Sequence, residues 1–336
     1  MRTRLKRFLL GVLRASGLFW LARRVTRKQL RILCYHGISI GDQHQYDPVL
    51  FMRRENFERR LRLIRKQGWR VVDLETGVRE LVAGTLPADT LVITIDDGWV
   101  STYTTMLPLL KRHDLPSTLY VTTYYAEVQR DVFNVVLYYM GWKSPLDRVQ
   151  LTTGYDFLDG DYQLKPDFSS VVSRWVEAAD RKLNAQQRQD LIPHIARSLQ
   201  LDPVETLADY RFRIMDRTQI RDASKSGMSI ELHTHRHFLP DESIEAMSVE
   251  IEENKRRLEE WTGQPCLHFC YPSGIYNVQQ SEWLAQLGLR SSTTCDPGNN
   301  HAGQHPHRLK RLLDRDSWSD IEFEAEISGL NALMGR

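Results

Sequence analysis

Short apolar segments alternate with longer amphipathic segments along most of the chain. The apolar segments predict strands at 31–39, 70–74, 91–97, 117–123, 228–235, 266–274, 290–295 and 308–313, and helical spacing predicts helices at 56–69, 101–114, 218–227, 243–263, 278–288 and 319–334. Strands that alternate with helices favour parallel pairing through right-handed crossovers. Seven or eight such units favour a barrel over an open sheet. The sequence therefore predicts an α/β fold, a distorted (β/α)7–8 barrel within 31–336.

One long interruption separates the fourth predicted strand from the next barrel helix. It covers 124–215 and is rich in Tyr, Trp, Arg and Asp. Within it, 130–142 and 167–183 have helical spacing, and 149–165 predicts a hairpin with Asp159-Gly160 as its turn. We expect this mostly helical insertion to form a cap at the carboxyl end of the barrel strands, where loops build sites.

Residues 1–30 predict a basic amphipathic arm. Its apolar residues recur at helical spacing, whereas several arginines lie off that stripe: the two sets are Leu5, Phe8, Leu9, Val12, Leu13 and Arg4, Arg7, Arg14. The longest apolar run, 8–13, is far shorter than the ~20 residues that span a bilayer. No clean small-x-small site follows it, so a signal peptide fits poorly. We expect a peripheral helix in the membrane interface, and the sequence does not distinguish the cytoplasmic from the extracytoplasmic face. The alternative is a helix packed on the outer wall of the barrel.

Composition agrees with a globular body carrying this arm. The chain has 336 residues, of which 41% are hydrophobic and 26% charged. Ten of its 45 basic residues lie in 1–31, whereas all 43 acidic residues follow that segment. The mildly acidic body gives no indication of nucleic-acid binding. Four cysteines are too few for a disulfide framework and predict buried, reduced side chains.

Polar residues gather where the predicted strands end. The segments are His36-Gly37, Asp96-Asp97-Gly98, the run 233–237 (HTHRH) and Pro272-Ser273-Gly274. In a parallel barrel all these ends lie on one rim. An aspartate and two histidines make a divalent-metal site with an open position, suited to zinc and also to cobalt or nickel. Adjacent side chains on a strand point to opposite faces, so Asp96 and Asp97 have either different tasks or only a turn to form.

These segments resemble the motifs of a known family. The sequences TIDDG (94–98), HTHRH (233–237), FCYPSG (269–274) and ILCYHGI (32–38) are similar to motifs of the polysaccharide deacetylases of the NodB-homology type, carbohydrate esterase family 4. The resemblance covers about 31–123 and 212–315, in the right order, and leaves out the arm and the insertion.

The resemblance implies a metal-dependent deacetylase. Its substrate would be an N-acetylated or O-acetylated polysaccharide, such as an exopolysaccharide, or a lipid-linked glycan. It assigns Asp96 as the general base and Asp97, His233 and His237 as ligands of a divalent metal, most simply Zn²⁺, with Co²⁺ or Ni²⁺ as alternatives. Water activated by the metal would attack the acetyl carbonyl. The third motif, Tyr271, Pro272 and Ser273, would contact the substrate and stabilise the oxyanion.

The general acid is the first departure from the family pattern. Many members carry a late L-x-H motif, whereas His305 and His307 do not stand in that pattern. In some relatives with the YH opening strand, that histidine is placed to act as the acid. We therefore expect His36 to protonate the leaving sugar nitrogen.

The third motif is the second departure. It lacks an arginine to orient the base, and Ser273 stands where tyrosine is common; Arg236 and Arg311 are the two candidates to replace the arginine. A carbohydrate-binding relative without turnover is therefore one alternative function. A glycoside hydrolase is less favoured, because neighbouring aspartates do not easily sit ~5–9.5 Å apart across a sugar.

Overall fold

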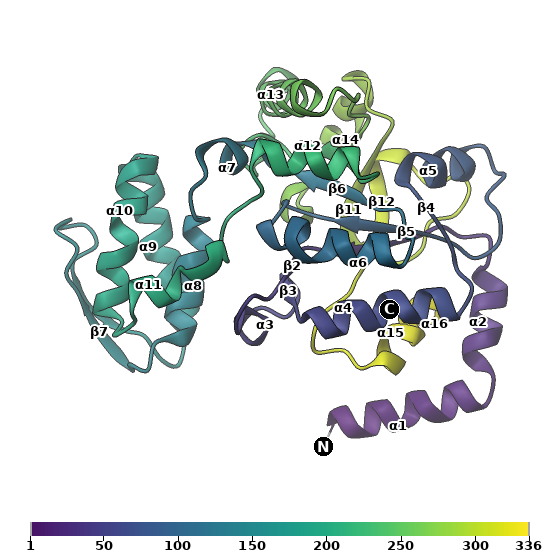
Figure 1. Cartoon of the computed structure of the whole chain (residues 1–336), viewed down its shortest axis with the longest axis horizontal. Coiled ribbons are helices and arrows are strands. Elements are labelled where there is room, and N and C mark those ends of the chain that lie inside the picture. Colours follow the sequence, from purple (N-terminus) through teal and green to yellow (C-terminus); the bar gives the residue numbers. More distant parts are fainter. Residues whose placement is uncertain (1, 335–336) are drawn as a thin grey trace.

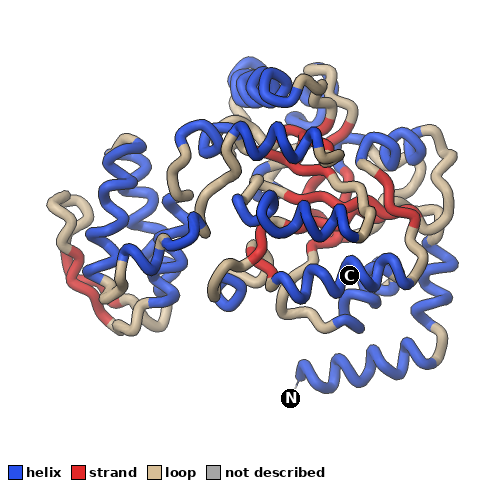
Figure 2. Tube along the Cα trace, in the orientation of Figure 1, coloured by secondary structure: helices blue, strands red, loops and turns tan. Residues whose placement is uncertain are grey.

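Seven parallel strands close into a barrel at the centre of the molecule. The computed structural model describes residues 2–334. Around the ring the strands are β1 (Arg31–Tyr35), β12 (Leu309–Leu313), β11 (Ser291–Pro297), β10 (His268–Cys270), β9 (Ser229–Leu232), β6 (Thr118–Val121) and β5 (Thr90–Ile95), which pairs again with β1. Figure 2 shows these strands running between the surrounding helices. The predicted barrel is confirmed.

An eighth strand lies outside the ring. The strand β4 (Arg70–Val72) pairs with the first half of β5, while β6 pairs with its second half. The predicted strand 70–74 is therefore too long. Asp73 caps a helix that the sequence reading missed, α5 (Leu74–Val82), by accepting a hydrogen bond of 2.8 Å from the backbone N–H of Thr76.

Helices cover the outside of the barrel (Figure 1). They are α4 (Arg54–Lys66), α5, α6 (Leu107–Arg112), α12 (Arg217–Lys225), α13 (Ile244–Thr262), α14 (Val278–Gln286), α15 (Asp320–Ile327) and α16 (Leu330–Leu333). The longest, α13, begins at the capping side chain of Ser243 and ends at Gly263, whose φ of 70° favours glycine. Because helices pack outside and side chains fill the barrel, all six residues of β5 are buried.

The predicted first strand, 31–39, is broken at His36. After β1 the chain forms β2 (Gly37–Ile38), which pairs with β3 (Phe51–Met52) across the short helix α3 (Gln43–Tyr46). A Cβ at Gly37 would lie 3.1 Å from the ring of Phe51, so glycine allows this close packing. The break leaves His36 at the rim of the barrel.

The insertion builds a separate group of helices beside the barrel, on the left in Figure 1. Its elements are α7 (Thr123–Val128), α8 (Phe133–Lys143), β7 (Arg148–Leu151), β8 (Gly160–Gln163), α9 (Phe168–Lys182), α10 (Ala185–Ser198) and α11 (Pro203–Thr206). The strands β7 and β8 form the predicted antiparallel hairpin. Asp159-Gly160 is not its turn, however, because Gly160 pairs with Leu151 and residues 152–159 form the connection. The Asp159 side chain instead folds that loop by accepting bonds from Thr153.

The arm forms two helices on the outer wall. The helices α1 (Arg2–Ala15) and α2 (Leu18–Thr26) meet at Gly17, whose φ is 81°, and pack on α15 and α16. In the part of the chain that the structure describes, no helix is both long and apolar enough to cross a membrane.

Candidate active site

Asp96 and Asp97 leave the end of β5 in different directions. The φ angles of Asp97 and Gly98 are 69° and 89°, so the strand geometry stops between the two aspartates. Both side chains are buried. Asp96 contacts Arg311, and Asp97 contacts His233 and His237. The two carboxylates therefore belong to different clusters, which also argues against a matched pair acting across a sugar.

Asp97, His233 and His237 bring three ligand atoms together. The Oδ1 atom of Asp97 lies 3.3 Å from Nε2 of His233 and 3.4 Å from Nε2 of His237. Ligands held 2.0–2.1 Å from a tetrahedral zinc ion lie about 3.3–3.4 Å apart, so this donor set fits such an ion. Burial alone would raise the pKa of Asp97, but hydrogen bonds from the two histidines hold it well below its ordinary range.

The backbone after β9 brings the two histidines to one target. Thr234 and His237 have positive φ angles of 61° and 60°, and these turns place His237 beside His233. His235 points away, as expected, and its Nδ1 lies 2.9 Å from the hydroxyl of Thr123. These strained backbone conformations lie next to the ligand atoms, and they orient the two histidines rather than improve the packing of the core.

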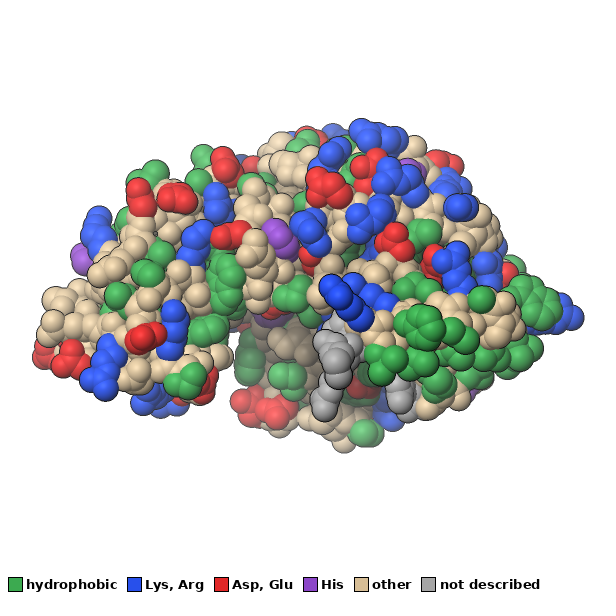
Figure 3. Space-filling model, turned by 90° about the horizontal axis from the view of Figure 1, so that it is seen from below, with side chains coloured by type: hydrophobic (Ala, Val, Ile, Leu, Met, Phe, Trp, Pro, Cys, Tyr) green, Lys and Arg blue, Asp and Glu red, His purple; other side chains and the backbone are tan. Residues whose placement is uncertain are grey.

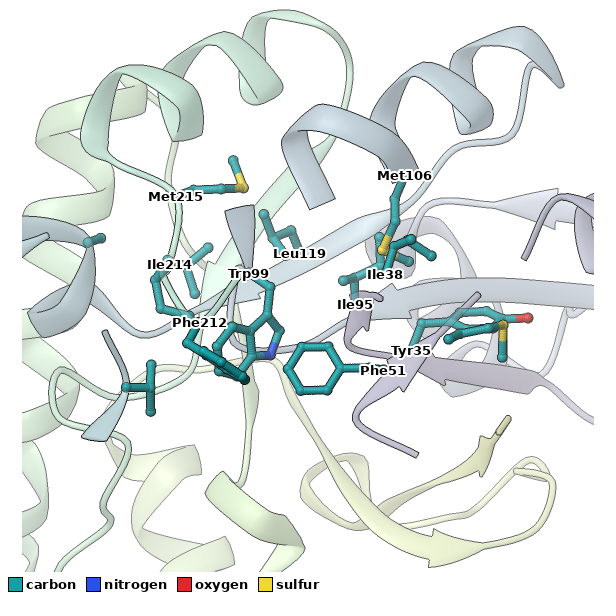
Figure 4. Packing of buried hydrophobic residues seen from close by; sticks show 14 of the residues in the cluster. Tyr35, Ile38, Phe51, Ile95, Trp99, Met106, Leu119, Phe212, Ile214 and Met215 are labelled. Carbon is teal, nitrogen blue, oxygen red and sulfur yellow. The ribbon is translucent and has the colours of Figure 1, made fainter. Parts of the chain in front are cut away.

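Neighbouring groups orient the ligands. The Nδ1 atom of His233 lies 2.8 Å from the carbonyl oxygen of Cys270, a contact that fixes the ring with Nε2 toward Asp97; with an ion bound there, Nδ1 would carry the proton and Nε2 would offer its lone pair to the ion. The indole N–H of Trp99 donates a 2.8 Å bond to the other oxygen of Asp97. Figure 4 shows Trp99 between Phe51 and Phe212, so its ring is fixed by the core.

Arg311 from β12 holds Asp96. Its two terminal nitrogens donate to the two oxygens of Asp96, each over 2.7 Å. Burial would raise the pKa of Asp96, but the charge and hydrogen bonds of Arg311 lower it to about 2. Arg236 pairs with Glu250 instead. Of the two candidates for orienting the base, Arg311 therefore has the position.

His36 stands at the edge of the same cluster. Its Nε2 lies 3.8 Å from Oδ2 of Asp96, and its Nδ1 has no hydrogen-bond partner within residues 2–334. The other candidates for the acid lie elsewhere: His307 is buried against Ser292, at 2.9 Å, and His305 contacts Glu282. His36 lines the cavity, whereas these two histidines do not.

The cavity at this rim has a volume of about 690 Å³. The barrel contributes His36, Asp96, Asp97, Trp99, His233, Arg236, His237, Ser273 and Cys295, and the insertion contributes Tyr124, Tyr125, Val132, Phe133, Asn134, Val135, Val176, Asp180, Ala185, Arg188 and Ile214. Of the third motif, only Ser273 lines it. The hydroxyl of Tyr271 donates to the carbonyl oxygen of His307, at 2.9 Å, and Pro272 is buried beside it. These positions favour a role for Tyr271 and Pro272 in holding the third motif in place, rather than in contacting the substrate.

A family model described as polysaccharide deacetylase matches residues 83–142 and 173–292, more than half of the chain. The chain belongs to the polysaccharide deacetylase family. As such it is a hydrolase of the deacetylase class, which acts on carbon–nitrogen bonds other than peptide bonds. No curated protein sequence matched the chain.

Solved structures share the deacetylase fold at low sequence identity. The deacetylase PplD of Streptococcus pyogenes, in complex with acetate, has a TM-score of 0.60 and 18% identity over 89% of this chain and 98% of its own. IcaB from Ammonifex degensii has a TM-score of 0.56 and 18% identity over 90% and 97% of the two chains. A de-N-acetylase from Aggregatibacter actinomycetemcomitans has a TM-score of 0.54 and 13% identity over 87% and 97%.

Sequence reasoning missed several groups around the deacetylase site. Trp99 follows DDG directly, but nothing in its position predicts the bond to Asp97. Two of the cysteines predicted as buried, reduced side chains lie at the Arg311–Asp96 pair: the thiols of Cys34 and Cys270 lie 3.6 and 3.5 Å from Oδ2 of Asp96. Arg311 was one of two candidates to orient the base, but the strand 308–313 (RLKRLL) holds three basic residues, so its pattern did not single out Arg311.

Proposed function

We propose that this deacetylase is metal-dependent and removes N-acetyl, or O-acetyl, groups from a polysaccharide or a lipid-linked glycan. The observation that carries the proposal is the spacing of the ligand atoms of Asp97, His233 and His237, beside a buried carboxylate that binds none of them. That arrangement separates holding an ion from moving a proton.

Zn²⁺ is the ion that this donor set suits best, with Co²⁺ or Ni²⁺ as alternatives. One carboxylate oxygen and two imidazole nitrogens leave a position open for water or substrate, as in catalytic rather than structural zinc sites. A divalent cation there would polarise the acetyl carbonyl and lower the pKa of a water molecule.

Asp96 acts as the general base in this proposal. Its pKa of about 2 keeps it ionised at neutral pH, and Arg311 fixes its orientation. It accepts the proton of the water whose oxygen bonds to the acetyl carbon. Ser273, from the third motif, lies at the cavity where the carbonyl oxygen gains negative charge, and the motif's backbone is proposed to donate to it.

His36 is the proposed general acid. Its ring reaches the cavity beside Asp96 without a strong competing bond. It donates a proton to the sugar nitrogen as the carbon–nitrogen bond breaks, so that a free amine and acetic acid leave, and the acid ionises to acetate in solution. The proton taken up by Asp96 restores His36 at the end of the cycle, and no further reactant is needed.

The lining of the cavity supports a sugar substrate. Tyr124, Tyr125 and Phe133 offer aromatic faces, while Asn134 and Arg188 offer hydrogen-bond donors. An exopolysaccharide is the class we expect first. The structure of PplD holds acetate, and the Aggregatibacter protein is a de-N-acetylase, which supports the same reaction product and bond for this chain.

The test is an acetate-release screen over a panel of acetylated glycans, with and without a chelator. We expect acetate from N-acetylglucosamine oligomers, loss of release with chelator and recovery on adding Zn²⁺, Co²⁺ or Ni²⁺. Glycan binding without acetate release under all metals would instead identify a binding protein without turnover. New reducing ends without acetate would identify a glycoside hydrolase.

A further inference from the structure

Helix α1 docks on the barrel through its charged side. Lys6 and Arg7 reach the buried carboxylate of Glu322 at 3.0 and 3.1 Å, and Arg14 reaches Glu324 at 3.3 Å. Among the side chains of α1 that the structure describes, Leu10 is the one buried apolar residue, and it lies in a small cluster with Ala325. The basic residues that a sequence reading assigns to a lipid surface are thus partly used to hold α1 on α15.

Most of the apolar stripe of α1 faces away from the protein; only Leu13 packs against the cluster of Leu10 and Ala325. Leu5, Phe8, Leu9 and Val12 are each more than half exposed, at the spacing that places them on one side of a helix. On α2 the exposed apolar residues are Leu18, Trp20, Leu21 and Val25. Together these eight residues form the α1–α2 apolar surface. Figure 3 shows hydrophobic side chains gathered over this part of the molecule.

An amphipathic helix on a soluble protein ordinarily turns its apolar stripe to the core. In α1 the exposed apolar residues point away from the core, and the ion pairs of Lys6, Arg7 and Arg14 hold the helix in this orientation. A contiguous exposed apolar surface of this kind marks an interaction site, because water contact at eight large side chains is costly.

The charges around this surface select the partner. Arg4, Arg24 and Arg27 form no ion pair within the described residues, and Arg24 lies 5.5 Å over the ring of Trp20. Residues 1–31 carry no acidic side chain. An exposed tryptophan, aliphatic side chains and unpaired arginines together match the boundary between headgroups and acyl chains of an anionic bilayer.

We propose that the α1–α2 apolar surface binds an anionic lipid bilayer and makes this deacetylase a peripheral membrane protein. The apolar side chains enter the headgroup region, and the three arginines contact lipid phosphates. This inference does not depend on the proposed catalytic mechanism. The other possible occupant, a second copy of the chain, is an outcome of the test.

The experiment is co-flotation of the full chain with vesicles. The probes are vesicles of phosphatidylcholine alone and of phosphatidylcholine with phosphatidylglycerol. The test variant is F8S/V12S, and its matched control is V204S/V278S, whose valines are 80% and 63% exposed away from the arm. A third variant, R4Q/R24Q/R27Q, tests the charges.

We expect the wild type and V204S/V278S to float with the anionic vesicles and to bind less at about 0.5 M NaCl. F8S/V12S should bind at least about tenfold more weakly, since two side chains that would enter the lipid are removed. R4Q/R24Q/R27Q should lose the preference for anionic lipid. Both arm variants should keep the thermal unfolding midpoint and the acetate release of the wild type on soluble oligomers.

Three results would overturn the proposal. The first is a wild type that floats with neither kind of vesicle, and the second is F8S/V12S binding equal to that of the wild type. The third is a wild-type dimer in light scattering that becomes a monomer in F8S/V12S, when neither the wild type nor this variant floats with vesicles. A wild type that binds vesicles but releases no acetate would count against the proposed function instead.

Discussion

Arg311 donates hydrogen bonds to both carboxylate oxygens of Asp96, although the two residues are 215 positions apart in the sequence. The contact joins the middle of β12 to the residue that follows β5, inside the barrel, where both side chains are buried. A buried carboxylate held this way keeps one direction and one charge state. The pair therefore fixes the base independently of the three ligand residues.

Replacing Arg311 by methionine tests whether Arg311 sets the protonation of Asp96. Burial then raises the pKa of Asp96 without the opposing charge, so the acid limb of the kcat/KM profile should move to higher pH. Removing one partner of a buried pair should also cost about 3–5 kcal/mol of unfolding free energy. R236Q is the control and should keep the acid limb in place. An unchanged acid limb in R311M would mean that Arg311 does not set the protonation of Asp96.

Trp99→Phe removes one hydrogen bond to Asp97 and keeps an aromatic ring in the core. We expect metal affinity to fall about 10–100-fold, because partners behind metal ligands tune their orientation. Competition with a chromophoric chelator measures this directly. The matched control is W175F, since the buried indole N–H of Trp175 has no partner in residues 2–334. Equal affinity in W99F and W175F would show that the Trp99 bond is dispensable.

His36→Ala separates acid catalysis from metal binding. Acetate release from an N-acetyl sugar should fall by about 10²–10⁴, while metal content stays at the wild-type level. An aryl acetate ester should be much less affected, because its leaving group needs no proton. H194A, which changes an exposed histidine outside the site, should behave as wild type. Equal losses on amide and ester would remove His36 from the role of acid.

Glu322 makes the docking of α1 depend on pH. Burial acts to raise its pKa, but hydrogen bonds from Ser319 and contacts with Lys6 and Arg7 lower it to about 2, below its ordinary value of 4.5. Because the folded state favours the charged form, this stabilisation is present above about pH 4.5 and is lost as the pH falls toward 2. The protection of the backbone amides of residues 2–15, measured relative to their intrinsic exchange rates, should therefore fall over that range.

At neutral pH, E322Q should speed hydrogen exchange in α1 by about tenfold, which corresponds to about 1.4 kcal/mol. The control E205Q changes an exposed glutamate of α11 and should leave α1 protected. Slow exchange in α1 of E322Q at pH 7 would show that the ion pairs do not hold the helix.

The alternation of strand and helix predicted the barrel because each element is encoded locally. The ligand residues were predictable for a related reason: they follow strands whose ends must share one rim. The insertion was only partly predictable. Helix α10 was missed because its sequence is mostly polar and contains Pro193, and its stability comes from packing on α8.

The surroundings of the ligands were not predictable in the same way. That Arg311, Cys34 and Cys270 meet at Asp96 depends on which strands become neighbours in the closed ring. The outward direction of the apolar stripe on α1 depends on Glu322 and Glu324, which lie at the other end of the sequence. Pairings of this range leave no periodic signal.

Metal content and acetate release, measured together on the same preparations, test the central claim most directly. We expect the wild type and H194A to hold about one divalent ion per chain and to release acetate. D97A and H233A should lose both, because each removes one of the three ligand atoms. If D97A or H233A keeps its metal and the wild-type rate of acetate release, Asp97, His233 and His237 are not the catalytic metal site.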